Sequence, residues 1–214
     1  MMLAAHALFG SEVVVAAPAA ASRASDASYG RIDGDVGVVV GVGVTAAPRG
    51  LRAATDLRFR YLDTVGAFVT YEDGPLLGAG TDPRRVLATG LELRPLFLGR
   101  WLAGKEVGAP RLDLAIDSFG IELGAFFSQP DGAAFGARPG FQAGLGIELP
   151  VLPRASGLWI GLHGGARWSD AALGGDLLRG PSDRALFLSM TLAWHQIFGA
   201  HVVDLNDRQT AALR

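Results

Sequence analysis

The sequence contains no cysteine among its 214 residues. Disulfide bonds, thiolate metal sites and cysteine nucleophiles are therefore excluded. Lysine is almost absent as well, since Lys105 is the only one, and the formal net charge is -2, so no basic surface calls for nucleic acid. After the first 28 residues, no segment approaches the roughly 18 uninterrupted apolar residues of a membrane-spanning helix. What remains is a chain long enough for one domain with a full core.

The first 28 residues differ in composition from the rest. They are rich in alanine, include an apolar stretch, and contain small-residue triplets such as "APA" that are typical of a signal-peptidase site. No basic segment precedes the apolar stretch, and Glu12 interrupts it. We therefore expect residues 1–28 to be either a cleaved leader or a disordered N-terminus. A polar tail is expected over residues 200–214.

From Tyr29 onward the hydrophobic pattern has a period of two, which is typical of β-strands. In "RIDGDVGVVVGVGVT", residues 31–45, valine on even positions alternates with glycine, aspartate and threonine on odd ones. The alternation recurs over 53–61, 65–72, 85–94, 111–127, 141–149, 158–168 and 185–198. The segment 111–127 changes phase near Asp117, which a β-bulge would explain. Residues 95–110 break the pattern and are expected to form a short interfacial helix or an irregular connection.

The two faces of these eight strands differ in what they could contact. If the valine and leucine face were inside, as in a soluble barrel, glycine would make up much of the water-facing side, with Phe68, Trp159 and Phe187 exposed. Glycine on a solvated strand face packs nothing and lowers strand propensity. If the apolar face is outside in lipid, the glycines make room for bulky side chains in a narrow interior. The pattern favours the second arrangement.

The inward face of that arrangement carries charges of both signs in nearly equal number. Buried charges need partners, so we predict a structural polar network in the lumen. Its expected members are Asp56, Arg58, Arg60, Glu92, Arg94, Glu122, Glu148, His163 and Arg167.

Segments of about ten alternating residues have the length of a tilted membrane strand, and several aromatic residues lie near segment ends. With eight such segments, an apolar leader and connections of mixed length, the chain resembles the small eight-stranded outer-membrane barrels of Gram-negative bacteria. The resemblance implies an all-β, antiparallel, up-and-down transmembrane barrel over residues 29–199. It also implies a location in the bacterial outer membrane, with the lipid bilayer as partner.

The expected function is an outer-membrane barrel of structural, adhesive or binding type. Its working surfaces would be the long loops at residues 73–84, 128–138 and 169–183. A narrow, filled lumen argues against a general porin.

Two alternatives stay open. One is a lipid-modifying barrel enzyme, which needs a nucleophile and a base together at one rim. Ser189 and His195 share a face, but at about 3.3 Å per residue they would lie near 20 Å apart, so no catalytic site is predicted. The other alternative is a soluble lipocalin-like carrier, which needs an apolar cavity. No metal or cofactor site is predicted, because clustered ligands and phosphate-loop motifs are missing from the sequence.

Overall fold

The computed structural model describes residues 29–32, 34–48, 50–77, 83–130, 132–174 and 184–200 of the chain. The expected leader over residues 1–28 and the expected tail after Ala200 lie outside these ranges, so both stay predictions. Among the described residues, no helix is long and apolar enough to cross a membrane.

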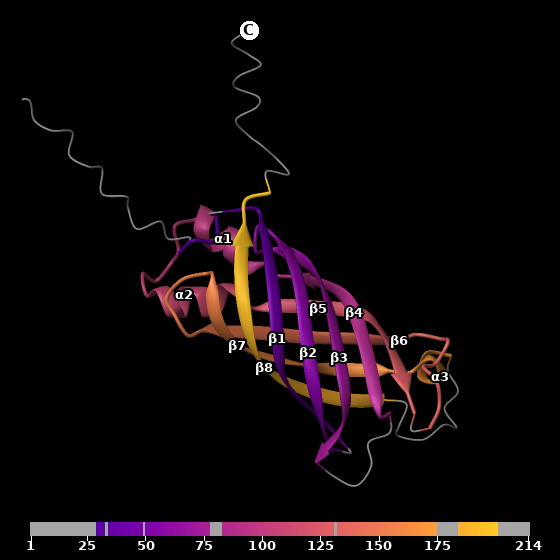
Figure 1. The fold of residues 1–214 in the computed structure, drawn as a ribbon. Coiled ribbons are helices and arrows are strands. Elements are labelled where there is room, and N and C mark those ends of the chain that lie inside the picture. The colour runs from indigo at the N-terminus through magenta and orange to yellow at the C-terminus, as the bar shows by residue number, and fades with distance from the viewer. Residues whose placement is uncertain are drawn as a thin grey trace, which may run out of the picture.

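Eight antiparallel strands follow one another in chain order and close into a barrel (Figure 1). Each strand pairs with its neighbours in sequence, and β1 pairs with β8, with Gly41 opposite Ala193, to complete the ring. The predicted all-β, antiparallel, up-and-down barrel of eight strands is confirmed. The strands are β1 (Val36–Ala47), β2 (Gly50–Tyr61), β3 (Val65–Leu77), β4 (Arg85–Leu93), β5 (Gly120–Gln129), β6 (Gly140–Pro150), β7 (Gly157–Trp168) and β8 (Arg184–Phe198).

Residues 111–117 were expected to form the first part of a bulged strand, and this prediction is wrong. They belong to helix α2 (Pro110–Asp117), and β5 begins only at Gly120. Proline suits the first helical turn, where its missing N–H would have no partner anyway. Asp113 and Asp117, four residues apart, lie on one helix face and are both buried. The phase change in the sequence therefore marks the end of a helix rather than a β-bulge.

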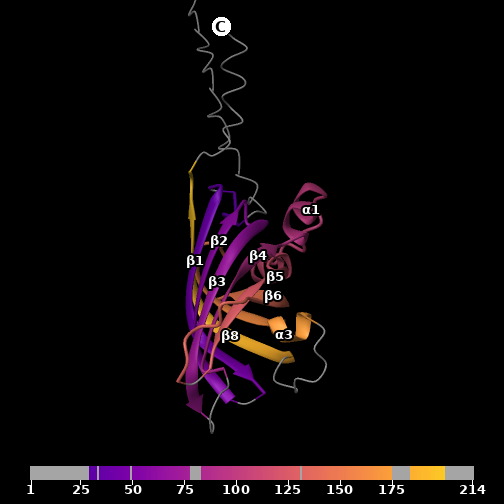
Figure 2. The ribbon, with the colours of Figure 1, turned by 90° about the vertical axis from the view of Figure 1, so that its right-hand side faces the viewer.

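A second helix, α1 (Leu96–Leu102), lies in the connection over residues 95–110. We call α1 and α2 together the helical cap. The cap lies at the end of the barrel where β1 starts and β8 finishes, the terminal end, and α1 stands away from the strands (Figure 2). The short helix α3 (Asp170–Leu173) lies at the opposite end, the loop end.

Working surfaces were predicted over residues 73–84, 128–138 and 169–183, and the described parts of these connections lie at the loop end. The strands reach further into them than predicted, since β3 runs to Leu77 and β5 to Gln129. Parts of all three lie outside the described residues, namely 78–82, 131 and 175–183.

Side chains alternate between an exposed and a buried face along the strands. In β8, Leu188 is 58% exposed and Met190 is 53% exposed, whereas Ser189 and Thr191 are 5% and 3% exposed. The valine and leucine face is outside, as predicted, and the inside holds the three aromatic residues that the opposite arrangement would have exposed, Phe68, Trp159 and Phe187.

Candidate functional site

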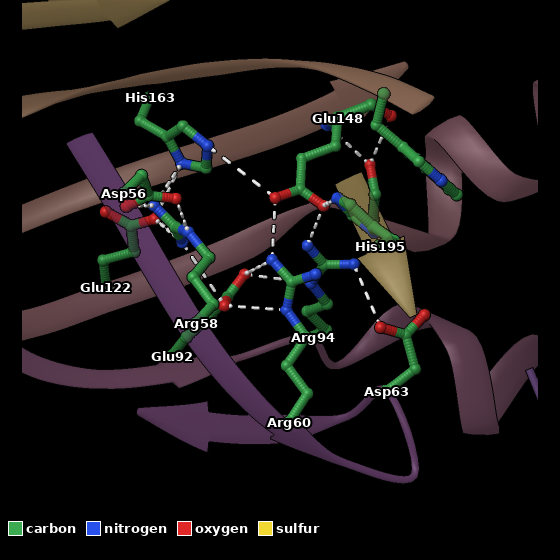
Figure 3. Close-up of polar contacts among 12 residues, drawn as sticks. Asp56, Arg58, Arg60, Asp63, Glu92, Arg94, Glu122, Glu148, His163 and His195 are labelled. Atoms are coloured by element: carbon green, nitrogen blue, oxygen red, sulfur yellow. Dashed lines mark hydrogen bonds and ion pairs between the residues drawn. The ribbon is translucent and has the colours of Figure 1, made fainter. Parts of the chain in front are cut away.

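All nine residues predicted for the polar lumen network lie on the buried face of the barrel. Their exposed fractions run from 1% for Arg94 to 5% for Arg167. Arg167 contacts a separate cluster nearer the loop end. The other eight lie together and are called the main network: Asp56, Arg58, Arg60, Glu92, Arg94, Glu122, Glu148 and His163 (Figure 3). That this set stabilises the barrel as one unit stays a prediction.

Arg58, on β2, organises one half of the main network. Its Nε donates to Asp56 Oδ2 at 2.6 Å, and its Nη1 donates to Glu122 Oε1 at 2.5 Å. The same Nη1 lies 3.3 Å from Glu92 Oε2. His163 Nδ1 lies 2.8 Å from Glu122 Oε1. Strands β2, β4, β5 and β7 are thereby joined across the interior through one guanidinium group.

Glu148, on β6, organises the other half. Its carboxylate accepts hydrogen bonds from Arg60 Nη2 at 2.7 Å and from Arg94 Nη2. Both arginines also donate from Nε to Glu92, at 3.0 Å from Arg60 and 2.9 Å from Arg94. Arg94 Nη1 donates in addition to Asp63, in the turn between β2 and β3. Two carboxylates and two guanidinium groups thus alternate at short distance, an arrangement that stabilises buried charge.

Two histidines flank Glu148 (Figure 3). His195 Nε2 lies 3.5 Å from Glu148 Oε2, and His163 Nε2 lies 3.8 Å from Oε1. Neither Nε2 atom has a hydrogen-bond partner among the described residues. The His195 ring stacks on Trp159, with centroids 4.5 Å apart and planes 6° apart. His195 was not selected for the network from the sequence, although the alternation along β8 places it on the inward face with Thr191.

A second polar group, the loop-end cluster, consists of Arg52, Glu72, Gln142 and Arg167. Arg167 Nη2 donates to Glu72 Oε1 at 2.6 Å, and Arg52 Nη1 donates to Glu72 Oε2 at 3.1 Å. Arg167 Nε donates to Gln142 at 2.7 Å. Only Arg167 was predicted from the sequence. Arg52 lies just before the alternating segment 53–61. Glu72 is the last residue of the segment 65–72 and lies on its inward face, but it was not selected for the network.

The charges of the two groups balance. Among the described residues they place five arginines (Arg52, Arg58, Arg60, Arg94, Arg167) against five carboxylates (Asp56, Glu72, Glu92, Glu122, Glu148), all buried. A buried charge is costly unless it is paired and hydrogen-bonded. Equal numbers allow the interior to be charged and still electrically neutral.

Two glycines show how the narrow interior accommodates these large side chains. A Cβ added at Gly146 would lie 2.4 Å from His163 Nδ1, and one at Gly140 would lie 2.4 Å from the Phe126 ring. Both distances are far inside van der Waals contact. The glycines of the inward face therefore supply space that the interior side chains occupy.

A third polar group, the cap cluster, joins the two helices of the cap to the segment before β1: Tyr29, Arg31, Arg100, Asp113 and Asp117. Arg31 and Arg100 each donate to Asp117 at 2.6 Å, and Arg100 also donates to Asp113 at 2.6 Å. Arg31 lies over the Phe97 ring at 3.9 Å. Sequence reasoning missed this cluster because it treated residues 111–117 as a strand.

Hydrogen bonding sets the charge state of Asp113. Burial alone would raise its pKa, but hydrogen bonds from the Val107 N–H, from Arg100 and from the Tyr29 hydroxyl outweigh burial and hold the pKa of Asp113 below its usual value. Burial and the neighbouring Asp113 carboxylate raise the pKa of Tyr29. The cap is therefore held by an ionised aspartate and a neutral tyrosine at neutral pH.

The geometry offers little room for chemistry. The strand register places Ser189 opposite His163, closer than the Ser189 and His195 pair weighed from the sequence. Ser189, however, accepts a hydrogen bond from Thr45 at 3.1 Å, and the cavity that it shares with His163 measures about 10 Å³. A second cavity, beside His195, measures about 20 Å³. Each is about the size of one water molecule. Among the described residues, no group of three or more histidine, aspartate or glutamate side chains could hold a metal ion.

Comparison with known proteins gives similarity to solved structures only. No family model matches the chain, and no curated protein matches it. One similar structure is that of Neisserial surface protein A (NspA), with 10% sequence identity, a TM-score of 0.39, and coverage of 74% of this chain and 94% of that chain. Another is Ail, the attachment invasion locus protein of Yersinia pestis, in complex with the heparin analogue sucrose octasulfate. It has 10% identity, a TM-score of 0.34, and coverage of 76% of this chain and 99% of that chain.

Proposed function

We propose that the protein is an outer-membrane β-barrel of structural, adhesive or binding type, held in lipid by its outer face and presenting its loop end as the interaction surface. The observation that carries this proposal is an apolar band on the outside of the barrel. All eight strands contribute exposed large hydrophobic side chains to it, among them Val40, Leu57, Val69, Leu91, Leu123, Leu145, Ile160 and Leu188.

Exposing this apolar band to water would be energetically unfavourable. Soluble monomers rarely expose contiguous apolar patches larger than a few hundred Å², and Leu91 alone is 67% exposed. Each Å² of such surface costs about 25 cal/mol in water. In a bilayer the same band is favourable, and a closed barrel leaves no strand edge unpaired in lipid.

The filled interior supports a role other than general diffusion. A barrel of eight strands has an interior just wide enough for side chains, and here guanidinium and carboxylate groups fill it. Interaction through the loop end is the remaining route to function. Among its described residues, Phe135 is 40% exposed and Arg138 is exposed.

The two alternatives are less well supported. A lipocalin-like carrier requires an apolar cavity, whereas the cavity between the main network and the loop-end cluster is lined by charged side chains such as Arg58, Glu72 and Arg167. A lipid-modifying enzyme requires a nucleophile and a base at a rim that substrate can reach. His163 and Ser189 are 4% and 5% exposed, in the interior.

Cell fractionation combined with a heat-modifiability gel tests the proposal. We expect the protein to sediment with the outer membrane and, before boiling, to migrate differently from the boiled sample, because a folded barrel resists detergent. The boiled portion of the same sample serves as the control. Recovery in the soluble fraction without detergent would contradict the proposal.

A further inference from the structure

Two connections at the terminal end expose apolar side chains beyond the strands. In and between the helices of the cap, Leu102 is 76% exposed, Val107 is 63% exposed and Leu112 is 49% exposed. In the turn between β6 and β7, Val151 and Leu152 are 39% and 41% exposed. We call these five residues together the foot. The turn and the cap are neighbours, since α2 packs on β6.

The cap is held in an orientation that keeps the foot exposed. Phe97, on α1, is 1% exposed and lies under Arg31. Arg100, three residues later on the same helix face, donates to Asp113 and Asp117. These contacts fix one face of α1 toward α2 and toward the segment that precedes β1. Leu102 lies outside these contacts and stays exposed while the ion pairs hold α1 on α2.

In the cap and in the turn between β6 and β7, as far as the structure describes them, the exposed charged side chains are all positive. Lys105, the only lysine of the chain, Arg111 and Arg154 are exposed. The acidic residues of the same two connections are covered, since Asp113 and Asp117 are buried and Glu106 is half-buried. A chain with a net charge of -2 thus presents a basic rim beside the foot.

We propose that the foot inserts into the membrane leaflet at the terminal end and that Lys105, Arg111 and Arg154 bind anionic phospholipid headgroups there. The inference rests on the proposed outer-membrane location. Apolar side chains bordered by basic ones are typical of segments that lie in a membrane interface. The turn residues of the foot also follow the apolar band of the barrel directly in the chain, because Leu149, near the end of β6, is 42% exposed and Val151 comes two residues later.

A lipid-quenching experiment on the full chain tests this proposal. Because the protein has no cysteine, Leu102→Cys can carry a single environment-sensitive dye, and Leu188→Cys on β8 provides the barrel reference. Each labelled protein is folded into phosphatidylcholine vesicles with and without phosphatidylglycerol, in which the acyl chains are brominated. We expect quenching at both positions, with stronger quenching at position 102 when phosphatidylglycerol is present.

A charge variant separates headgroup binding from simple burial. Replacing Lys105, Arg111 and Arg154 by Gln should lower the ratio of inserted to free foot by roughly fivefold for each charge removed, as judged from quenching at position 102. Quenching at position 188 should not change. Arg138→Gln, at the loop end, is the matched control and should leave both signals unchanged.

The outcomes distinguish the foot from the barrel. Quenching at position 188 without quenching at position 102 would overturn the foot and leave the proposed function intact. No quenching at either position would overturn the proposed function itself. An apolar dye environment at position 102 without quenching would assign the foot to a protein contact, and would also overturn the proposal.

Discussion

Removing Arg94 should destabilise the barrel far more than removing any exposed charge. Arg94 is 1% exposed and donates to three carboxylates, those of Glu92, Glu148 and Asp63. In Arg94→Ala, Glu148 would keep Arg60 as its one remaining arginine partner in hydrogen-bond contact. Breaking a buried pair by deleting one partner typically costs about 3–5 kcal/mol, because the remaining charge stays buried. We expect the free energy of unfolding to fall by this amount.

Urea unfolding of the protein in lipid vesicles, followed by the gel shift between folded and unfolded barrel, measures that change. Arg138→Ala, in an exposed loop position, is the control and should alter stability by no more than about 0.5 kcal/mol. The double variant Arg94→Ala with Glu148→Ala should lose less than the sum of the two single variants, since the residues are in contact. If Arg94→Ala behaved like Arg138→Ala, the assignment of a paired, buried network would be refuted.

Three further outcomes are expected. Gly146→Ala should destabilise the protein by roughly 1–3 kcal/mol in the same urea assay, because its Cβ would press on His163. Gly99→Ala, in open space on α1, is the control and should be neutral or stabilise by up to about 1 kcal/mol. Equal effects of the two substitutions would contradict the close packing at Gly146. Asp113→Asn should weaken the cap at neutral pH, as detected by proteolysis of the connection between the helices. The pKa of Asp113 is lowered in the folded state, so the ionised carboxylate contributes its full stability to the cap above the unfolded pKa of about 3.9. That contribution is lost as the pH falls through the folded pKa. The difference between the two proteins should therefore disappear in acid, and a larger difference there would contradict the role given to Asp113. In planar bilayers the protein should show no steady conductance, since cavities of about 20 Å³ and 10 Å³ do not form a path for ions, and a stable open channel would contradict the filled interior.

The period of two was sufficient to predict the barrel and its facing. Alternation assigns each residue of a strand to one face, and glycine-rich inward positions opposite Phe68, Trp159 and Phe187 decided which face is inside. The odd or even position of a charged residue in its strand also indicated whether its side chain points into the interior. It could not predict which of the interior charges pair, because pairing depends on the stagger between strands. The approach of Arg94, after β4, to Glu148, on β6, is an example.

The helical cap shows where this reasoning failed. Its apolar residues near Asp113 alternate over a few positions, and so short a stretch fits a strand or a helix equally well. Pro110 was the available signal, since proline favours a first helical turn. Recognising it would have placed Asp113 and Asp117 on one face. Arg31, which donates to Asp117, precedes β1, and no local pattern connects it to a residue 86 positions later in the chain.

The most direct test of the membrane assignment is the alternation itself, measured residue by residue along β8. Single cysteines at each position from Leu186 to Trp194 would carry a small environment-sensitive dye in vesicles with brominated acyl chains. We expect quenching at the even positions, which are exposed, and poor labelling without quenching at the odd positions, which are buried between them. Absence of quenching at Leu186, Leu188, Met190 and Leu192 in the folded protein would contradict a lipid-facing outer surface.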